Sequence, residues 1–202
     1  MRAGHPLIAG IDEVGRGAWA GPVVAGAVIL NLTQARKLRE VNDSKKLTAR
    51  QREALFSLII NASIAHGIGS ASVAEIDSIG ILNATRLAMQ RAIEMLTPQP
   101  NALIIDAVKL SQVNLPQSVF NFADSISLSV AAASILAKVS RDRMLIDLDA
   151  QYPGYDFARH KGYGTPNHQA ALQSIGPCEI HRRTFKPIRL ISDRLISDQL
   201  IS

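Results

Sequence analysis

Two short apolar runs near the start of the chain restrict its topology more than any other feature. The run LIAGI covers Leu7 to Ile11, the run VVAGAVIL covers Val23 to Leu30, and both have the length and composition of buried strands. The segment between them is too short for a helical crossover, which needs about a dozen residues or more. We therefore expect the two strands to be antiparallel neighbours in one sheet.

Further along the chain, helical and strand patterns alternate. Thr48 and Gln51 form a capping-box pattern, which predicts a helix that begins near Ala49. Residues 62–72 have the pattern of a third strand. Apolar residues within 82–96 recur at helical spacing and predict a longer helix that ends at the following prolines.

Four acidic residues follow predicted strands directly or closely. LIAGI is followed by Asp12 and Glu13, the run ALII immediately precedes Asp106, and SVFNF lies just before Asp124. In an α/β sheet such strand ends meet along one edge, where functional sites usually form. Four carboxylates gathered there repel one another unless cations lie between them, and oxygen ligands suit Mg²⁺ or Mn²⁺. Their joint occurrence predicts a metal-dependent nuclease.

Each acid also has an ordinary structural interpretation. Asp124 stands before a predicted helix, where an aspartate serves as an N-cap, and Asp106 can be a simple loop acid. Asp12 and Glu13 are adjacent, so a regular strand would point them to opposite faces. We therefore expect the strand to end, twist or bulge at this pair, which the glycines that follow make easy.

The second half of the chain is predicted to be largely helical. From Ser125 the apolar spacing predicts a helix with three basic residues near its end, and Thr165 with Pro166 predicts a short helix that closes near Gly176. Between them YPGYDFARHKGYG has the composition of a loop, and we interpret ISDRLISDQLIS as a terminal appendage. The prediction of the helix from Ser125 rests on the spacing of its apolar residues and on the basic residues near its end, which are Ile126, Val130, Ala133, Ala137, Lys138, Arg141 and Arg143.

Composition limits the class of protein. The 202 residues suit one domain, and no apolar run approaches the roughly 20 residues of a membrane-spanning helix. The single cysteine, Cys178, cannot form an internal disulfide and favours a reducing compartment, so we expect the cytoplasm. A formal net charge of +5 is compatible with a nucleic-acid partner but does not require one.

The glycine-rich stretch GRGAWAG follows the first acids. Its spacing differs from a dinucleotide-binding turn and it leads into a strand, so that function is disfavoured. Glycines at 15 and 17 instead let main-chain groups approach a ligand closely, while Arg16 adds a positive charge. Such a surface can sense the 2′-hydroxyl that distinguishes RNA from DNA.

These stretches, taken together, resemble the bacterial ribonuclease HII family. The resemblance runs from about Leu7 to Pro187 and is carried, in the family's order, by GIDEVGRG with AGPVV, DSKKL, IID, DSISLSVAAASILAKVSRDR, YPGYDF with HKGYGT, and HRRTFKP. It implies an α/β ribonuclease H-like fold, a mixed five-stranded sheet flanked by helices with a C-terminal helical extension. We expect a core over 1–147 and a C-terminal segment over 148–202 that together form one catalytic domain.

The resemblance also implies an activity and a set of site residues. The family hydrolyses the RNA strand of RNA/DNA hybrids and nicks duplex DNA 5′ to an embedded ribonucleotide, using two Mg²⁺ or Mn²⁺ ions and leaving a 3′-hydroxyl and a 5′-phosphate. It makes Asp12, Glu13, Asp106 and Asp124 the catalytic metal ligands. It makes Gly15, Arg16 and Gly17 the ribonucleotide-recognition motif and Tyr163 the ring against the next deoxyribose. Phosphate contacts are expected at Lys45, Lys46, Lys161, Arg182 and Arg183.

The chain departs from the family pattern beside two of the acids. After Asp106 the chain has Ala107, Val108 and Lys109 where many relatives have glycine and asparagine, and Ala123 precedes Asp124 where glycine is common. Two other functions stay open at this point, a junction-resolving nuclease of similar fold and a non-catalytic nucleic-acid-binding protein. We expect a monomer whose partners are ribonucleotide-containing duplexes and, in addition, replication or repair factors.

Overall fold

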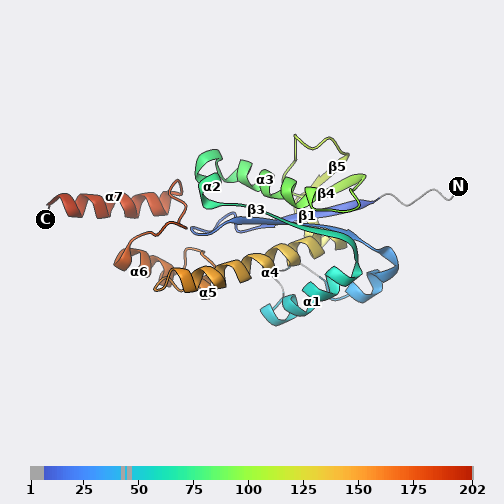
Figure 1. Cartoon of the computed structure of the whole chain (residues 1–202), viewed down its shortest axis with the longest axis horizontal. Coiled ribbons are helices and arrows are strands. Elements are labelled where there is room, and N and C mark those ends of the chain that lie inside the picture. The colour runs from blue at the N-terminus through green and yellow to red at the C-terminus, as the bar shows by residue number, and fades with distance from the viewer. Residues whose placement is uncertain (1–6, 42–43, 45–46, 202) are drawn as a thin grey trace. The chain divides into compact units, whose positions relative to one another are not determined.

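A computed structural model describes residues 7–41, 44 and 47–201 of the chain (Figure 1). The chain divides into two compact units, each with its own apolar core. The first, called the sheet unit here, comprises Met1–Val14, Val24–Ser70 and Thr85–Ser140, and the second, called the helical unit, comprises Gly15–Val23, Ala71–Ala84 and Arg141–Ser202.

The sheet unit is built on a mixed sheet of five strands in the order β3-β2-β1-β4-β5. The central strand β1 pairs antiparallel with β2, as expected from the short connection, and parallel with β4, which in turn pairs parallel with β5. The mixed five-stranded sheet that the family resemblance implies is thus confirmed. The strands are β1 (Ile8–Val14), β2 (Val23–Leu30), β3 (Ser63–Ala71), β4 (Ala102–Asp106) and β5 (Gln117–Phe120).

Helices cover both faces of this sheet (Figure 1). On one face, α1 (Ala49–Ala62) and the first part of α4 (Leu128–Gln151) share a core cluster with β2. On the other face, α3 (Ile81–Glu94) lies so close to β3 that a Cβ on Gly69 would stand 2.1 Å from the carbonyl oxygen of Ala88. Glycines in the strands therefore let α3 and α4 approach the sheet backbone.

Local capping signals fix several helix starts. The Thr48 side chain accepts from the backbone of Gln51, whose own side chain accepts from the Thr48 N–H, so the predicted capping box is confirmed. A second capping box, at Ser72, begins α2 (Val73–Ile79), a helix that the sequence did not predict. A short 3-10 helix, η1 (Leu32–Leu38), follows β2 with Asn31 as its N-cap.

The helical unit has a separate core formed by residues from distant parts of the chain. Ala20, Leu145, Phe157, Leu172 and Ile188 are buried together in it. The predicted short helix is confirmed as α6 (Pro166–Ile175), with Thr165 as N-cap and Gly176 as C-cap. The expected loop also contains the short α5 (Phe157–His160), and the tail belongs to α7 (Lys186–Ile201).

Several expected boundaries were wrong. The helix expected from Ser125 begins at Leu128, because Phe122 takes a left-handed conformation and starts the 3-10 turn η3 (Ala123–Ser125). The same helix runs on to Gln151, since its continuation contributes Leu145 to the helical unit's core, so the three basic residues lie inside it. Strand β5 ends at Phe120 and helix α3 ends at Glu94, each slightly earlier than expected.

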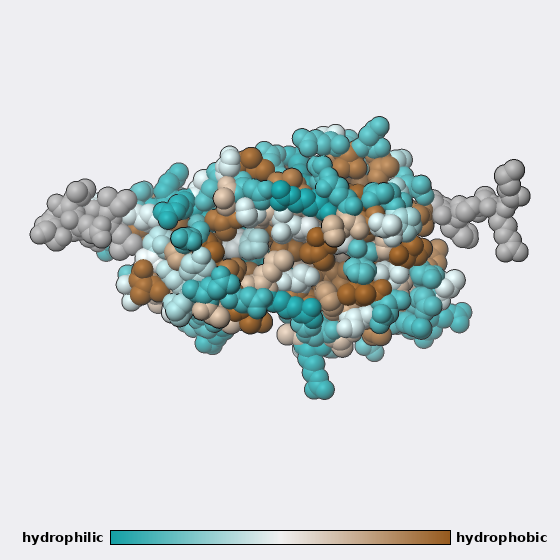
Figure 2. Space-filling model, in the orientation of Figure 1, coloured by the Kyte–Doolittle hydropathy of each residue, from teal (hydrophilic) through white to brown (hydrophobic). Residues whose placement is uncertain are grey.

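Apolar and polar residues are interspersed over the visible surface (Figure 2). The most exposed large apolar side chains include Phe122, at 75% exposure, and Ile126, at 68%, which flank the turn of Asp124. Within the described part of the chain, no helix is long and apolar enough to cross a membrane.

The contact between β1 and α4 gives a first test. A Cβ on Gly10 would lie 2.2 Å from the backbone carbonyl carbon of Ser129, so Gly10→Ala must push α4 away from the sheet. We expect the free energy of unfolding in urea to fall by about 2 kcal/mol or more. Gly17→Ala is the control, because a Cβ there meets nothing within 4 Å, and it should change stability by less than about 0.5 kcal/mol. Equal effects of the two substitutions would contradict this packing.

Candidate active site

The pairing of β1 with β4 sets Asp12 beside Asp106. Ile11 is paired with Ile105 in the parallel ladder, and each acid is the next residue along its strand. Paired residues of neighbouring strands point to the same face, so both carboxylates lie on one side of the sheet at its carboxyl edge. Asp12 is buried, with 5% of its surface exposed, and Asp106 is half-buried.

Glu13 follows Asp12 directly within a regular strand. The expected end or bulge at Asp12 and Glu13 was wrong, because β1 pairs with β2 in unbroken register as far as Val14. The chain turns only at Gly15, whose φ is 91°. Strand alternation places Glu13 on the opposite face from Asp12, yet its charge still acts on Asp12 and its Oε2 atom is buried.

Asp124 lies in the η3 turn, which is tied to β4. The backbone N–H of Ala123 donates to Asp106 Oδ1 at 2.9 Å, so the residue before Asp124 is held by the neighbouring acid. Asp124 is 6% exposed. The sheet unit thus sets Asp12 beside Asp106, and the Ala123 N–H links the η3 turn that contains Asp124 to Asp106.

The electrostatics of Asp12 reflect this gathering of acids. Burial, followed by the charge of Glu13, raises the pKa of Asp12 to about 8, and Asp106 adds to the rise. The Ser134 hydroxyl and the Glu13 N–H form hydrogen bonds to the Asp12 carboxylate that act in the opposite direction. The protonated form of Asp12 is therefore favoured near neutral pH.

Two serines behind Asp12 were missed by sequence reasoning. Ser134 projects from α4 toward Asp12, and its Oγ lies 2.9 Å from Oγ of Ser44, which belongs to the DSKKL stretch. Both serines are buried, at 5% and 6% exposure. A polar residue inside the small apolar run VAAASILA was the available signal, because a buried serine needs a partner.

The residues fit divalent cations by their chemistry. Clustered carboxylate oxygens are the ligands that Mg²⁺ and Mn²⁺ prefer, and a cation would compensate the charge that raises the pKa of Asp12. Among the residues that the structure describes, no group of three or more His, Cys, Asp or Glu side chains is arranged to hold a metal ion.

The glycine-rich turn lies in the helical unit, where buried arginines fix its backbone. A Cβ on Gly15 would lie 2.1 Å from Nε of Arg141, so only glycine fits there, while Arg16 and Gly17 are exposed at the tip. Arg182 donates to the carbonyl oxygen of Arg16 at 2.9 Å and to that of Gly21. Arg182 is fully buried, so the expected direct contact of its guanidinium with phosphate was wrong.

The other expected contacts differ in their exposure. Tyr163 is half-buried, with the Arg141 guanidinium 5.6 Å from its ring centroid. Lys161 is half-buried and its ammonium donates to the carbonyl oxygen of Ala158. Arg183 is exposed, whereas Lys45 and Lys46 lie outside the described residues.

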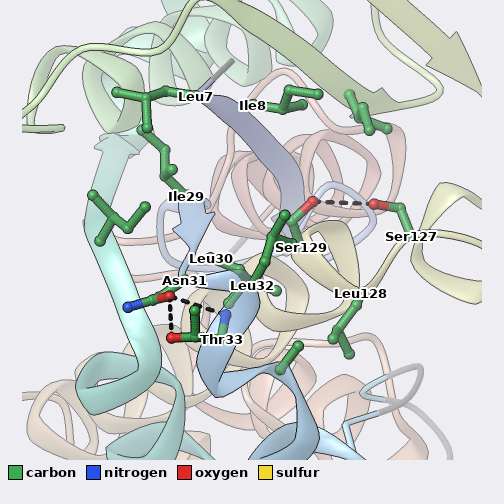
Figure 3. A pocket seen from close by; sticks show the side chains of 13 residues that line it. Leu7, Ile8, Ile29, Leu30, Asn31, Leu32, Thr33, Ser127, Leu128 and Ser129 are labelled. Carbon is green, nitrogen blue, oxygen red and sulfur yellow. Dashed lines mark hydrogen bonds between the residues drawn. The ribbon is translucent and has the colours of Figure 1, made fainter. Parts of the chain in front are cut away.

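A pocket of about 410 Å³ in the sheet unit lies elsewhere (Figure 3). Its aliphatic walls include Leu7, Ile8 and Ile29, and the hydrogen-bonded hydroxyls of Ser127 and Ser129 stand at its edge (Figure 3). Ile8 begins β1, whereas Asp12 is four residues further along, about 13 Å away in a strand. Among the described residues, none of those expected in the site lines this pocket, and its apolar walls suit neither cations nor phosphates.

Fold and acids together define a ribonuclease H-like protein, with carboxylates at the ends of adjacent central strands of a mixed sheet. Comparison with known proteins narrows this class. The family model described as "Ribonuclease HII" matches residues 9–188, and the chain belongs to the ribonuclease HII family. The chain is therefore an endonuclease that acts on RNA/DNA hybrids, which disfavours the junction-resolving and non-catalytic alternatives.

Individual relatives agree with this assignment. The ribonuclease HII of Geotalea uraniireducens is 50% identical over 188 residues, which cover 93% of this chain and 86% of the relative. The chain in the crystal structure of ribonuclease H2 from Pyrococcus horikoshii is 28% identical to this chain in sequence and superposes with a TM-score of 0.79. The match covers 94% of this chain and 98% of that one. The matched chain in the structure of a PCNA:RNase HII complex from Archaeoglobus fulgidus is 27% identical to this chain, with a TM-score of 0.75. The match covers 89% of this chain and 95% of that one.

The raised pKa of Asp12 predicts a pH-dependent stability. In the absence of divalent ions the folded protein holds this proton up to a pKa of about 8, whereas the unfolded chain releases it near 3.8. The stability that protonated Asp12 contributes to the folded protein is thus complete below about pH 4 and is lost as the pH rises through about 8. Because Asp12→Asn stays neutral, its advantage in the free energy of unfolding should grow to about 1–3 kcal/mol above pH 8.

Urea unfolding in EDTA at about pH 5 and about pH 8.5 measures this difference. Asp147→Asn, which changes an exposed acid of α4, is the matched control and should give the same stability difference at both pH values. An advantage of Asp12→Asn that did not change with pH would contradict the burial of an ionisable Asp12.

Substitution by glycine of the two alanines beside the acids is expected to change the free energy of unfolding in opposite directions. Ala107 has a φ of 55°, and the Val108 N–H donates to the Asp106 carbonyl at 2.7 Å, so Ala107 centres a tight left-handed turn. Ala107→Gly should raise the free energy of unfolding by about 0.5–1 kcal/mol. Ala123 is fully buried in η3 and is not among the residues with positive φ. Ala123→Gly should therefore lower it by about 1 kcal/mol. Thermal unfolding measures both, and a stabilising Ala123→Gly would contradict the turn geometry.

Proposed function

We propose that Asp12, Glu13, Asp106 and Asp124 hold two divalent cations, Mg²⁺ or Mn²⁺, and that the chain cleaves the phosphodiester 5′ to a ribonucleotide. The observation that carries this proposal is the β1–β4 register, which places two of the acids side by side, where burial and the charge of Glu13 raise the pKa of Asp12. Bound cations supply activation of the attacking water and stabilisation of the leaving 3′-oxygen. The products are a 3′-hydroxyl and a 5′-phosphate.

The chain's own residues orient the metal-binding acids. Ser134 directs its hydroxyl to Asp12, and Ser44 fixes that hydroxyl from the other side. The Ala123 N–H holds Oδ1 of Asp106 at 2.9 Å and so fixes the orientation of that carboxylate. Such supporting contacts keep ligands in place for binding without large rearrangement of the backbone.

Substrate recognition is assigned to the helical unit. We propose that Gly15, Arg16 and Gly17 present main-chain groups and one charge to the ribonucleotide, and that Tyr163 packs against the next deoxyribose. The fixed backbone of the turn and the exposure of its tip support this assignment. Lys161 and Arg183, with Lys45 and Lys46, are proposed phosphate contacts.

A replication factor is proposed as a further partner. The Archaeoglobus fulgidus neighbour was solved in complex with PCNA, a protein–protein assembly that this chain's family membership makes relevant. We expect the chain itself to be a monomer that works in the cytoplasm.

Cleavage and metal binding test the proposal together. With Mg²⁺ or Mn²⁺ the protein should nick a DNA duplex that contains one ribonucleotide, on the 5′ side of that ribonucleotide, and should leave all-DNA duplexes and four-way DNA junctions intact. Asp106→Asn should lower kcat/KM by about 100-fold or more, because it removes a ligand charge. Calorimetric titration with Mn²⁺ should show weaker binding by the same variant.

Asp147→Asn again serves as the matched control, since it removes one negative charge, as Asp106→Asn does, but from an exposed position of α4. It should retain parental activity and metal affinity. Parental cleavage or parental Mn²⁺ affinity in Asp106→Asn would show that the acid cluster is not the metal centre.

A further inference from the structure

Three buried histidines of the helical unit have no assigned part in metal binding or cleavage. His160 is 7% exposed, and His168 and His181 are fully buried. The His160 and His168 rings stack at 4.4 Å with an interplanar angle of 13°. Buried polar groups have to form hydrogen bonds, so the partners of each ring nitrogen define its protonation.

The contacts of His168 and His181 allow one arrangement of protons. His168 Nδ1 lies 3.0 Å from the Tyr163 carbonyl oxygen, which only accepts, so Nδ1 carries the hydrogen. In the neutral ring His168 Nε2 is then an acceptor, and His181 Nε2, 2.9 Å away, must donate to it. His181 Nδ1 accordingly accepts from the Cys178 N–H at 2.9 Å, while the Cys178 carbonyl lies farther away, at 3.3 Å.

His160 is satisfied as a neutral ring in the same manner. Its Nδ1 accepts from the Gly162 N–H at 3.1 Å, and its Nε2 donates to the Tyr155 carbonyl oxygen at 2.6 Å. A further proton on any of the three rings would set two donors face to face. Burial lowers the pKa of His168 and of His181 to about 4, in keeping with neutral rings.

The ionisable groups that face this cluster do not favour a charged ring. His160 lowers the pKa of His168, and Arg183 lowers that of His181 together with the other two histidines. Burial raises the pKa of the Cys178 thiol and that of Tyr155, so both stay protonated. His168 and His181 are therefore neutral near pH 7.

This network holds the backbone on both sides of the Tyr163 ring. His168 binds the carbonyl of Tyr163, and His160 binds the N–H of Gly162 just before it. The Gly162 carbonyl accepts from the Trp19 N–H at 2.8 Å, so the loop is fixed from a second element. With its backbone held, Tyr163 keeps its ring under the Arg141 guanidinium.

We propose that His168, its proton fixed by His181, is the positioning residue for Tyr163 and so contributes to recognition of the deoxyribose that follows the ribonucleotide. His168 acts through its Nδ1–H bond to the Tyr163 carbonyl. This inference rests on the proposed role of Tyr163, so its experiment has to test the two roles separately.

A matched pair of substitutions isolates the relevant bond. The amide nitrogen of His168→Asn occupies the δ position and can donate to the Tyr163 carbonyl as Nδ1–H does. The amide of His168→Gln reaches the ε position instead, where it can meet His181 but leaves the Tyr163 carbonyl unpaired. Each variant can keep one of the two hydrogen bonds of His168 and loses the other, so the pair separates the bond to Tyr163 from the bond to His181.

The readout is a specificity ratio, kcat/KM for a duplex with one ribonucleotide divided by kcat/KM for a uniform RNA/DNA hybrid. The uniform hybrid offers no deoxyribose after the cleaved ribonucleotide, so it reports activity without the contact of Tyr163. His168→Gln should lower the ratio by about tenfold, and His168→Asn by less than about twofold. In a Tyr163→Ala background, His168→Gln should change the ratio no further.

Each outcome separates the two hypotheses. If Tyr163→Ala leaves the ratio unchanged, the proposed role of Tyr163 is wrong. If Tyr163→Ala lowers the ratio while the Gln and Asn variants of His168 behave alike, or while His168→Gln adds its full effect to Tyr163→Ala, Tyr163 keeps its role and the positioning inference is overturned.

A measurement on the unaltered protein requires no variant to fold. Long-range ¹H–¹⁵N NMR of the imidazole rings should show the Nδ1–H tautomer for His168 and the Nε2–H tautomer for His160 and His181 near pH 7. An Nε2–H tautomer at His168 would remove the donor to Tyr163 and overturn the inference.

Discussion

The parallel pairing of β1 with β4 is the constraint on which the site depends. One register, Ile11 with Ile105, carries two carboxylates to the same edge and the same face of the sheet. A slip by one residue would turn one of them to the opposite face, because side chains alternate along a strand. The cost of this placement appears in Asp12, where burial and neighbouring charge oppose ionisation. Bound cations would offset this opposition to ionisation. The strand pairing that buries the carboxylates and the proposed metal chemistry therefore depend on each other.

Sequence patterns predicted the parts of the fold that are set locally. The capping box at Thr48, the N-cap at Thr165 and the antiparallel pairing forced by a short connection all involve residues close in the chain. The length of α4 could not be predicted in this way, because Leu145 has its apolar partners far away in sequence. The start of α4 depended on a left-handed Phe122, a conformation that residue type does not favour.

The acids of the candidate site could be proposed from the sequence, whereas the contacts that support them could not. Acids at predicted strand ends marked Asp12, Asp106 and Asp124 before any geometry was known. The role of Arg182 was misjudged because an arginine in a basic stretch is usually exposed, whereas here it binds backbone carbonyls in the interior. Ser134 was missed because a hydroxyl on a helix gains meaning only from what it faces.

The two buried guanidiniums have a consequence for the helical unit's electric field. Arg141 and Arg182 are fully buried and held by main-chain carbonyls of the glycine-rich segment. Mobile counterions cannot enter such a site, so these charges are screened far less than those of surface lysines. Part of the positive potential around this turn should therefore persist at ionic strengths that abolish ordinary surface attraction. A polyanion held there would retain some affinity where purely superficial contacts have failed.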